Sequence, residues 1–166
     1  MDAFRTWSES VRSLTACPDS RHRGPGTGPL LPLTASASTD PVTPSRSGLH
    51  LLDGILPTSA IGQLSLAHAE LAYLSACSTA HREWRQADEA LHLASAFHLA
   101  GFRHVIASLW SLDDRTAATA AHAFYQRLPA TTADHAATAL HHVTRSLRAE
   151  HPDRPDLWAP LIHSGP

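Results

Sequence analysis

The sequence predicts an α/β protein in which a mainly parallel sheet carries helices on both faces. Two short apolar runs, residues 70–76 and 104–110, have the character of buried strands. They alternate with segments of helical periodicity over residues 85–100, 113–128 and 133–150. Strands separated by helices of this length are typical of parallel sheets that are covered on both sides.

Residues 1–47 differ in composition from the rest of the chain. The run RHRGPGTGPLLPLTASASTDPVTPSRSG is dense in Pro, Gly, Ser and Thr and lacks sustained periodicity. Such a composition favours loops or disorder. We therefore expect a mostly disordered, low-complexity segment over residues 1–47 and a folded part over residues 48–166.

The folded part is expected to begin with a hairpin, a short helix and a strand. Residues 49–57 form two apolar pieces around Asp53-Gly54, a strong turn pair. Thr58 or Ser59 then provides an N-cap for a short helix. The apolar residues 70–76 follow as a buried strand.

The helix expected over residues 85–100 has one apolar face. Its apolar residues fall at i, i+3, i+4 and i+7, namely Ala90, Leu93, Ala94 and Phe97. Gly101 is placed to end this helix as a C′ glycine. The strand HVIASLW, residues 104–110, follows and is rich in β-forming side chains.

Two further helices and an edge strand complete the expected order. Ser111 or Asp113 caps the first helix, whose inner face carries Ala117, Ala121, Phe124 and Leu128. The inner stripe of the second helix carries Ala136, Leu140, Val143 and Leu147. The segment LWAPLIHS near the end of the chain is expected to supply the edge strand.

Composition excludes several classes of function. A net charge of −2 over 166 residues gives no electrostatic basis for binding nucleic acid or an acidic membrane. Cys17 and Cys77 are too few and too far apart for a disulfide framework, so we expect a cytoplasmic protein. Thirteen histidines occur without HExxH or Cys-x-x-Cys spacing, so neither metal nor cofactor is expected.

Three polar residues follow the two predicted strands, at the edge where open α/β sheets bind ligands. Cys77 comes just after the first strand, and Asp113-Asp114 comes just after the second. A cysteine in such a position is either a buried inert thiol or a nucleophile that faces a crevice. The two aspartates are either helix-capping acids or groups that line a binding pocket.

The segments around these residues resemble the CHAT domain, a caspase-like peptidase domain associated with tetratricopeptide repeats. The resemblance covers about residues 38–165. It rests on four motifs: Leu74 to Cys77 with Thr79, Ala96-Phe97 with Ala100-Gly101, Leu109-Trp110, and Asp113-Asp114.

This resemblance implies a caspase-like sheet and cysteine-dependent hydrolysis of peptide bonds. It implies that Cys77 is the nucleophile and that Trp110, Asp113 and Asp114 shape the substrate pocket. In such chemistry a histidine takes the thiol proton, and backbone N–H groups bind the oxyanion. A protein or peptide substrate and a tetratricopeptide-repeat partner are the implied binding partners, with no metal or organic cofactor, nucleic acid or membrane.

The sequence departs from the family at the position of the catalytic histidine. Ser36 stands where the resemblance places that histidine, and no apolar strand is expected to lead into it. A serine hydroxyl is no base at neutral pH. Four other histidines remain as candidate replacements, each alternatively an exposed loop residue: His22, His50, His68 and His81. We therefore expect a truncated domain of weak or absent activity, or a non-catalytic interaction or regulatory module with the same fold.

Overall fold

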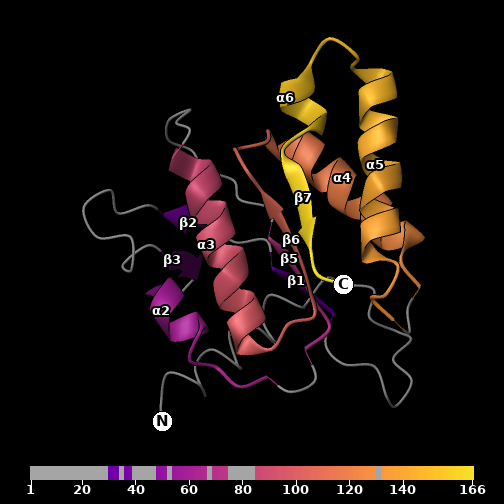
Figure 1. Ribbon diagram of the computed structural model, residues 1–166. Coiled ribbons are helices and arrows are strands. Elements are labelled where there is room, and N and C mark those ends of the chain that lie inside the picture. The colour runs from indigo at the N-terminus through magenta and orange to yellow at the C-terminus, as the bar shows by residue number, and fades with distance from the viewer. Residues whose placement is uncertain are drawn as a thin grey trace.

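The computed structural model describes most of the chain from residue 30 onward. The described ranges are residues 30–33, 36–38, 48–51, 54–66, 69–74, 85–129 and 132–166. Together they form two sheets and a set of helices that pack on both faces of the larger sheet (Figure 1). The α/β class expected from the sequence is confirmed.

The larger sheet has four strands in the order β1-β5-β6-β7. The strands are β1 (Leu30–Leu33), β5 (Leu71–Leu74), β6 (His104–Ser108) and β7 (Leu161–Ser164). β1 pairs parallel with β5 and β5 pairs parallel with β6, whereas β7 runs antiparallel to β6.

The smaller sheet is antiparallel throughout. It contains β2 (Ser36–Ser38), β3 (Gly48–Leu51) and β4 (Gly54–Pro57) in that order. β3 and β4 are the two arms of the hairpin expected around Asp53-Gly54. The short helix α2 (Thr58–Ile61) follows directly, although its N-cap is Pro57 and no side chain caps it.

The expectation of a mainly parallel sheet is therefore wrong: the fold contains a mixed sheet and a separate antiparallel one. The reason lies in the connection between β6 and β7. A single crossover helix would return the chain to the amino end of β6 and produce a parallel strand. Here two long helices and α6 lie between the strands, and the chain enters β7 from the carboxyl end of β6.

A second correction concerns the segment that leads to Ser36. The sequence Leu30–Leu33 forms strand β1 and pairs with β5, so a strand does precede Ser36. Both β1 and β2 also lie within the segment expected to be mostly disordered. β1 could not be recognised from composition, because this strand is short and contains Pro32. Proline has no N–H to donate and is confined to sheet edges, where β1 lies.

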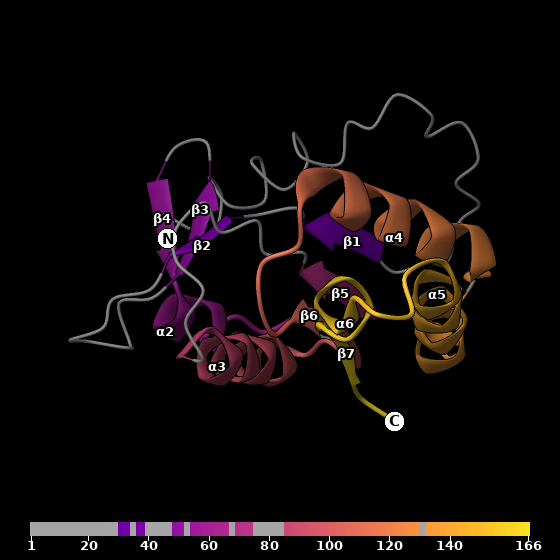
Figure 2. The ribbon, with the colours of Figure 1, turned by 90° about the horizontal axis from the view of Figure 1, so that it is seen from above.

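Helices cover the two faces of the larger sheet. Figure 2 shows α3 (Arg85–Ala100) on one side and α4 (Asp114–Arg127) on the other. α5 (Ala136–Glu150) packs beside α4, and the four-residue helix α6 (Pro155–Trp158) lies between α5 and β7 in sequence and contacts α5. The bounds predicted for α3 are confirmed.

Alternate residues of the strands belong to two separate hydrophobic cores. On the α3 side, the core contains Phe97 and Phe102, whose rings meet edge to face, with Ala72, Leu74, Val105 and Ala107 from the strands. On the α4 and α5 side it contains Leu71, Tyr73, Ile106 and Phe124, together with the stripe Ala136, Leu140, Val143 and Leu147. The predicted inner stripe of α5 is confirmed, because all four of its residues are buried.

Gly101 ends α3 in a conformation that favours glycine. Its φ is 112°, and a Cβ at this position would lie 2.5 Å from the carbonyl oxygen of Leu66. The chain can thus turn closely over the loop that leads to β5, and Leu66 N–H donates to the Ala100 carbonyl at 2.8 Å. This close approach fixes the start of β6 beside β5.

Candidate functional site

The carboxyl ends of three parallel strands lie side by side at one edge of the larger sheet. Leu33 of β1 pairs with Leu74 of β5, which pairs in turn with Ala107 of β6. The chain segments that follow these strands therefore start from neighbouring positions. In open α/β sheets this edge is the usual place for ligand binding.

Cys77 itself lies outside the residues that the structure describes, as do His22, His68 and His81. Its position is fixed in sequence only, three residues after β5 ends at Leu74. Ser36 likewise comes three residues after β1 ends at Leu33. The two candidate dyad positions thus follow paired strand ends by the same number of residues.

The fourth alternative histidine, His50, lies in β3 directly opposite Ser36. The antiparallel pairing of β2 with β3 places these two residues in register. Directly paired residues on antiparallel strands have Cβ atoms about 5 Å apart. Of the four alternative histidines, His50 is the one whose backbone the structure places, and it pairs with Ser36, where the resemblance places the base.

Trp110 belongs to the loop that follows β6, and the C-terminal part of the chain holds it in place. Its indole Nε1 donates a hydrogen bond to the backbone carbonyl of Asp156 at 2.9 Å, and its own carbonyl accepts from the Ser108 hydroxyl. One residue earlier, the Leu109 N–H donates to the Pro160 carbonyl at 2.9 Å. The half-buried indole is therefore fixed between the sheet edge and α6.

Asp113 caps α4 and is exposed. Its backbone is extended, and its Oδ1 accepts a hydrogen bond from the Thr116 N–H at 3.0 Å. Hydrogen bonding by Thr116, through its side chain first and its backbone second, lowers the pKa of the Asp113 carboxyl. Of the two predicted caps, Ser111 and Asp113, the structure has Asp113. Asp114 is the first residue of α4 and is also exposed.

The structure adds an ion pair to this edge that the sequence did not indicate. Arg154 holds Asp156 through two nitrogens, with Nε to Oδ1 at 2.9 Å and Nη2 to Oδ2 at 2.7 Å. Pro155 at the first turn of α6 favours the start of this helix, and Asp156, the next residue, both pairs with Arg154 and anchors Trp110 through its backbone carbonyl. The signal in the sequence was the motif PDRPD, which by itself indicates only a helix break.

A metal centre is not found within the described ranges. No group of three or more His, Cys, Asp or Glu side chains there is arranged to hold a metal ion. The described helices also include none with the length and apolar character needed to cross a membrane.

Comparison with protein families identifies the domain. The family model of the CHAT domain matches residues 14–166, which is nearly the whole chain. The chain belongs to the CHAT domain family. A search of curated proteins gave no significant match. The CHAT match starts well before β1, so strands β1 and β2 belong to the domain together with the elements that follow them.

Proposed function

We propose that this CHAT domain has the caspase-like fold of the caspase and separase clan of cysteine peptidases, with Cys77 as its nucleophile. The observation that carries the proposal is the parallel pairing of β1, β5 and β6. It puts the starts of three segments at one sheet edge: the one that contains Ser36, the one that contains Cys77 and the one that contains Trp110. A nucleophile, a base position and a substrate pocket need this kind of convergence.

The chemistry requires the thiol of Cys77 to lose its proton to a neighbouring base. The thiolate then attacks a peptide carbonyl, and backbone N–H groups stabilise the oxyanion. Ser36 has no lone pair basic enough for that first step. The domain is therefore weakly active or inactive unless another residue accepts the proton.

His50 is the residue that we propose for this role, if any residue fills it. Its register opposite Ser36 brings an imidazole-bearing residue next to the missing base. A base carried by the neighbouring strand would reach the thiol with a different geometry, so we expect slower catalysis than a complete dyad would give. His22, His68 and His81 lie outside the described residues.

The pocket for the residue before the scissile bond is proposed to lie beside Trp110. The flat indole forms one wall, while Asp113 and Asp114 contribute negative charge at its rim. Carboxylates favour a substrate with a basic side chain at this position. Asp113 is both a helix cap and part of this negative charge, and these two roles can be separated by substitution.

The first test is the reaction of Cys77 with iodoacetamide, followed by mass spectrometry of the labelled peptide. An activated thiol at pH 7 reacts about tenfold faster than a model thiol, because a free cysteine is only a few per cent thiolate at that pH. The His50→Gln variant should return Cys77 to the model rate. A Cys77 that reacts no faster than a model thiol in the wild type would exclude activation by His50.

A gain of function tests the base position independently. Ser36→His should restore the dyad and raise both the alkylation rate of Cys77 and cleavage of Arg-containing peptides. Ser38→His is the matched control, since it puts the same side chain in the same strand two residues away. Equal rates for the two variants would show that Ser36 is not the base position.

The alternative function is a non-catalytic interaction or regulatory module. The serine at the base position favours it, because a protein that only binds has no need for a proton acceptor there. In that case Cys77→Ala leaves capture of a tetratricopeptide-repeat partner unchanged, and Ser36→His adds no peptidase activity. Cleavage of peptides by the wild-type chain that disappears in Cys77→Ala would exclude this alternative.

A further inference from the structure

Two histidines from different strands, one buried and one half-buried, form a hydrogen-bonded pair at the end of the strands opposite to the candidate site. His104 begins β6 and His163 lies in β7, and Nδ1 of the first is 3.1 Å from Nε2 of the second. His104 is only 1% exposed. Gly165 closes the site, since a Cβ on it would lie 3.1 Å from His104 Nδ1. Neither ring has a part in the proposed peptidase chemistry.

The second ring nitrogen of His104 is buried without a partner. Its Nε2 has no hydrogen-bond partner in the described part of the chain. In protein interiors, N–H groups without a partner are rarer than under-satisfied acceptors. The favoured arrangement therefore has the proton of His104 on Nδ1, donated to His163 Nε2, with His104 Nε2 unprotonated.

This arrangement resists protonation at either ring. A proton added to His104 Nε2 creates a buried cation with an unsatisfied N–H. A proton added to His163 Nε2 sets two N–H groups against each other, unless His104 moves its own proton from Nδ1 to Nε2. Both routes thus leave a proton on the buried Nε2 of His104. Proton uptake by the His104–His163 pair is therefore costly while β6 and β7 stay paired.

The neighbouring charges do not offset this cost. Arg103 precedes His104, and its Nη1 lies 3.3 Å from both Glu70 Oε2 and Asp134 Oδ1, so these carboxylates are already paired with a cation. Burial first, and then the charge of Arg103, lowers the pKa of His104, while Asp134 and Glu70 act weakly in the other direction.

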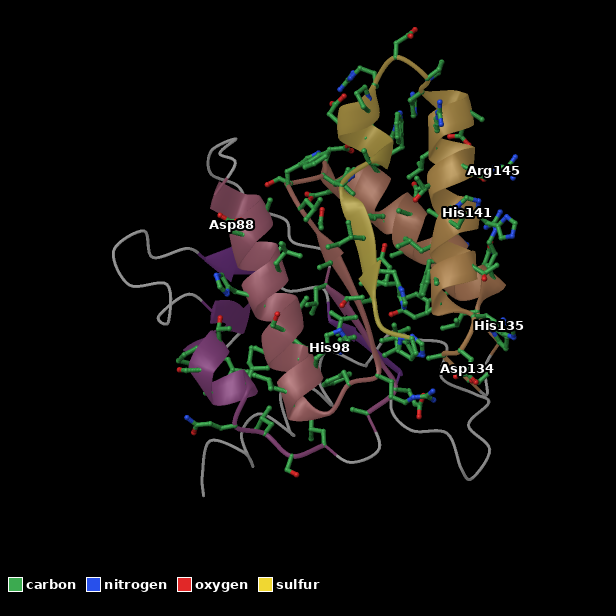
Figure 3. The ribbon with its side chains drawn as sticks, in the orientation of Figure 1. Asp88, His98, Asp134, His135, His141 and Arg145 are labelled. Atoms are coloured by element: carbon green, nitrogen blue, oxygen red, sulfur yellow. The ribbon has the colours of Figure 1, made fainter. Side chains whose placement is uncertain are left out.

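His163 is affected in the same direction, and α3 also reaches its strand. Burial lowers the pKa of His163, and His104 and His98 lower it further. His98 on α3 donates from Nδ1 to the Phe102 carbonyl at 2.9 Å, and its Nε2 lies 2.9 Å from the hydroxyl of Ser164 in β7 (Figure 3). The pair and His98 together hold β7 in place through hydrogen bonds.

We propose that the His104–His163 pair is an acid-sensitive switch that holds β7 on β6 at neutral pH and releases it on acidification. The argument rests on the geometry of the pair and is independent of the peptidase function proposed above. Release of β7 also has a definite structural consequence. β7 follows directly from Pro160, which accepts the Leu109 N–H, and from α6, which anchors Trp110.

The direction and size of the effect follow from proton linkage. The open state binds more protons below the ordinary histidine pKa of about 6.5, so opening is favoured as the pH falls through that value. Each proton that the closed pair excludes increases the opening equilibrium constant at pH 5 about 30-fold, and two excluded protons increase it about 1,000-fold.

Hydrogen exchange of the full-length chain at pH 7.5, 6.0 and 5.0 tests the proposal. After correction for intrinsic exchange rates, the backbone amides of residues 161–164 should lose protection by 30- to 1,000-fold between pH 7.5 and 5.0. Amides of β5 should remain more protected than these at every pH. Protection of residues 161–164 that does not change with pH would overturn the proposal.

Two variants and one control separate the contributions of the two rings. His104→Gln should abolish the pH response, because a protonated His163 can donate to the amide oxygen of Gln. His163→Gln should keep a response of about 30-fold, because His104 Nε2 stays buried. His141→Gln is the control, since His141 is exposed on α5 and points away from the sheet (Figure 3). A full response in His104→Gln would refute the switch.

A measurement on the wild type covers the case in which the variants fail to fold. The ring ¹⁵N chemical shifts of His104 should show a protonated Nδ1 and a bare Nε2 at pH 7.5. The resonances of the closed form should keep that pattern at pH 5.0 while they lose intensity to the open form. An imidazolium at His104 in the closed form at pH 5.0 would overturn the proposal.

Discussion

Asp113 offers a test that separates a structural role from a role in the substrate pocket. Its carboxylate accepts the Thr116 N–H at 3.0 Å and caps α4. The helix carries Phe124, a fully buried ring in the core between α4 and the sheet. Asp113→Ala removes both the cap and the charge, whereas Asp113→Asn removes the charge and keeps a side chain that caps well.

The expected magnitudes come from the capping bond. Loss of an N-cap acceptor costs about 1 kcal/mol, within a range of about 0.5–2 kcal/mol. For a chain of this length, this lowers the melting temperature by about 2–4 °C. Asp113→Asn should cost only a few tenths of a kcal/mol at neutral pH, mainly through the lost interaction with the helix dipole. The control Asp153→Ala, in an exposed turn, should change the stability by less than about 0.5 kcal/mol.

The pH dependence of the stability provides a second test of the cap at Asp113. Because the pKa of Asp113 is lowered in the folded state, its contribution to stability is present above about pH 4 and is lost as the pH falls through the folded-state pKa. The stability difference between wild type and Asp113→Ala should therefore be constant from pH 7 to pH 5 and shrink below pH 4. Asparagine does not ionise, so the cap in Asp113→Asn should persist at low pH.

Urea unfolding monitored by circular dichroism, between pH 3 and pH 7, measures the stability of the wild type and of the three variants. In parallel, cleavage of Arg- and Gln-containing peptides by a Ser36→His background reports on the pocket. If Asp113 attracts basic side chains, Asp113→Asn lowers the preference for Arg while the stability is nearly unchanged. An Asp113→Ala variant as stable as the wild type at pH 7 would refute the cap, and an unchanged preference for Arg would refute the pocket.

Three further predictions concern packing. Leu140→Ala in α5 should destabilise the protein by about 2–5 kcal/mol. The matched control Leu99→Ala, at a residue 75% exposed, should cost less than about 0.5 kcal/mol. Similar losses for the two variants in urea unfolding would contradict the assigned core. Gly101→Ala should lower the stability by about 1–3 kcal/mol or more, because a φ of 112° is strained for alanine and the added Cβ approaches the Leu66 carbonyl. An unchanged melting temperature would argue against this turn. Tyr73→Phe should stabilise the protein by about 1 kcal/mol, because its buried hydroxyl has no partner in the described part of the chain; a loss of stability would point to a hidden hydrogen bond.

Local signals in the sequence predicted the three long helices well, whereas the cap expected at Thr58 or Ser59 was wrong and α6 was not predicted. The spacing of apolar residues gave the bounds of α3, and a buried inner stripe was predicted correctly for α5. The N-cap at Asp113 and the terminating Gly101 were also correct, because both depend on side-chain or backbone chemistry within one helical turn. These features need no information from distant parts of the chain.

Features that depend on distant residues were missed. The Trp110 indole and the Asp156 carbonyl are 46 residues apart in sequence, and the two histidines of the His104–His163 pair are 59 apart. Nothing in their local patterns indicates that they meet. The antiparallel direction of β7 was missed for a related reason, since it depends on how several helices pack between two strands. β1 was missed because four residues that include a proline carry little periodicity.

The unequal size of alternate side chains in the central strands has a consequence for how the fold tolerates change. Ala72 and Ala107 face the core on the α3 side, whereas Tyr73 and Ile106 face the core on the other side. Sliding β5 by a single residue would push a phenol ring into space sized for a methyl group, so misaligned pairings are strongly disfavoured. The loops that follow these strands can therefore vary in length and sequence, while the strand ends from which they start keep the same register.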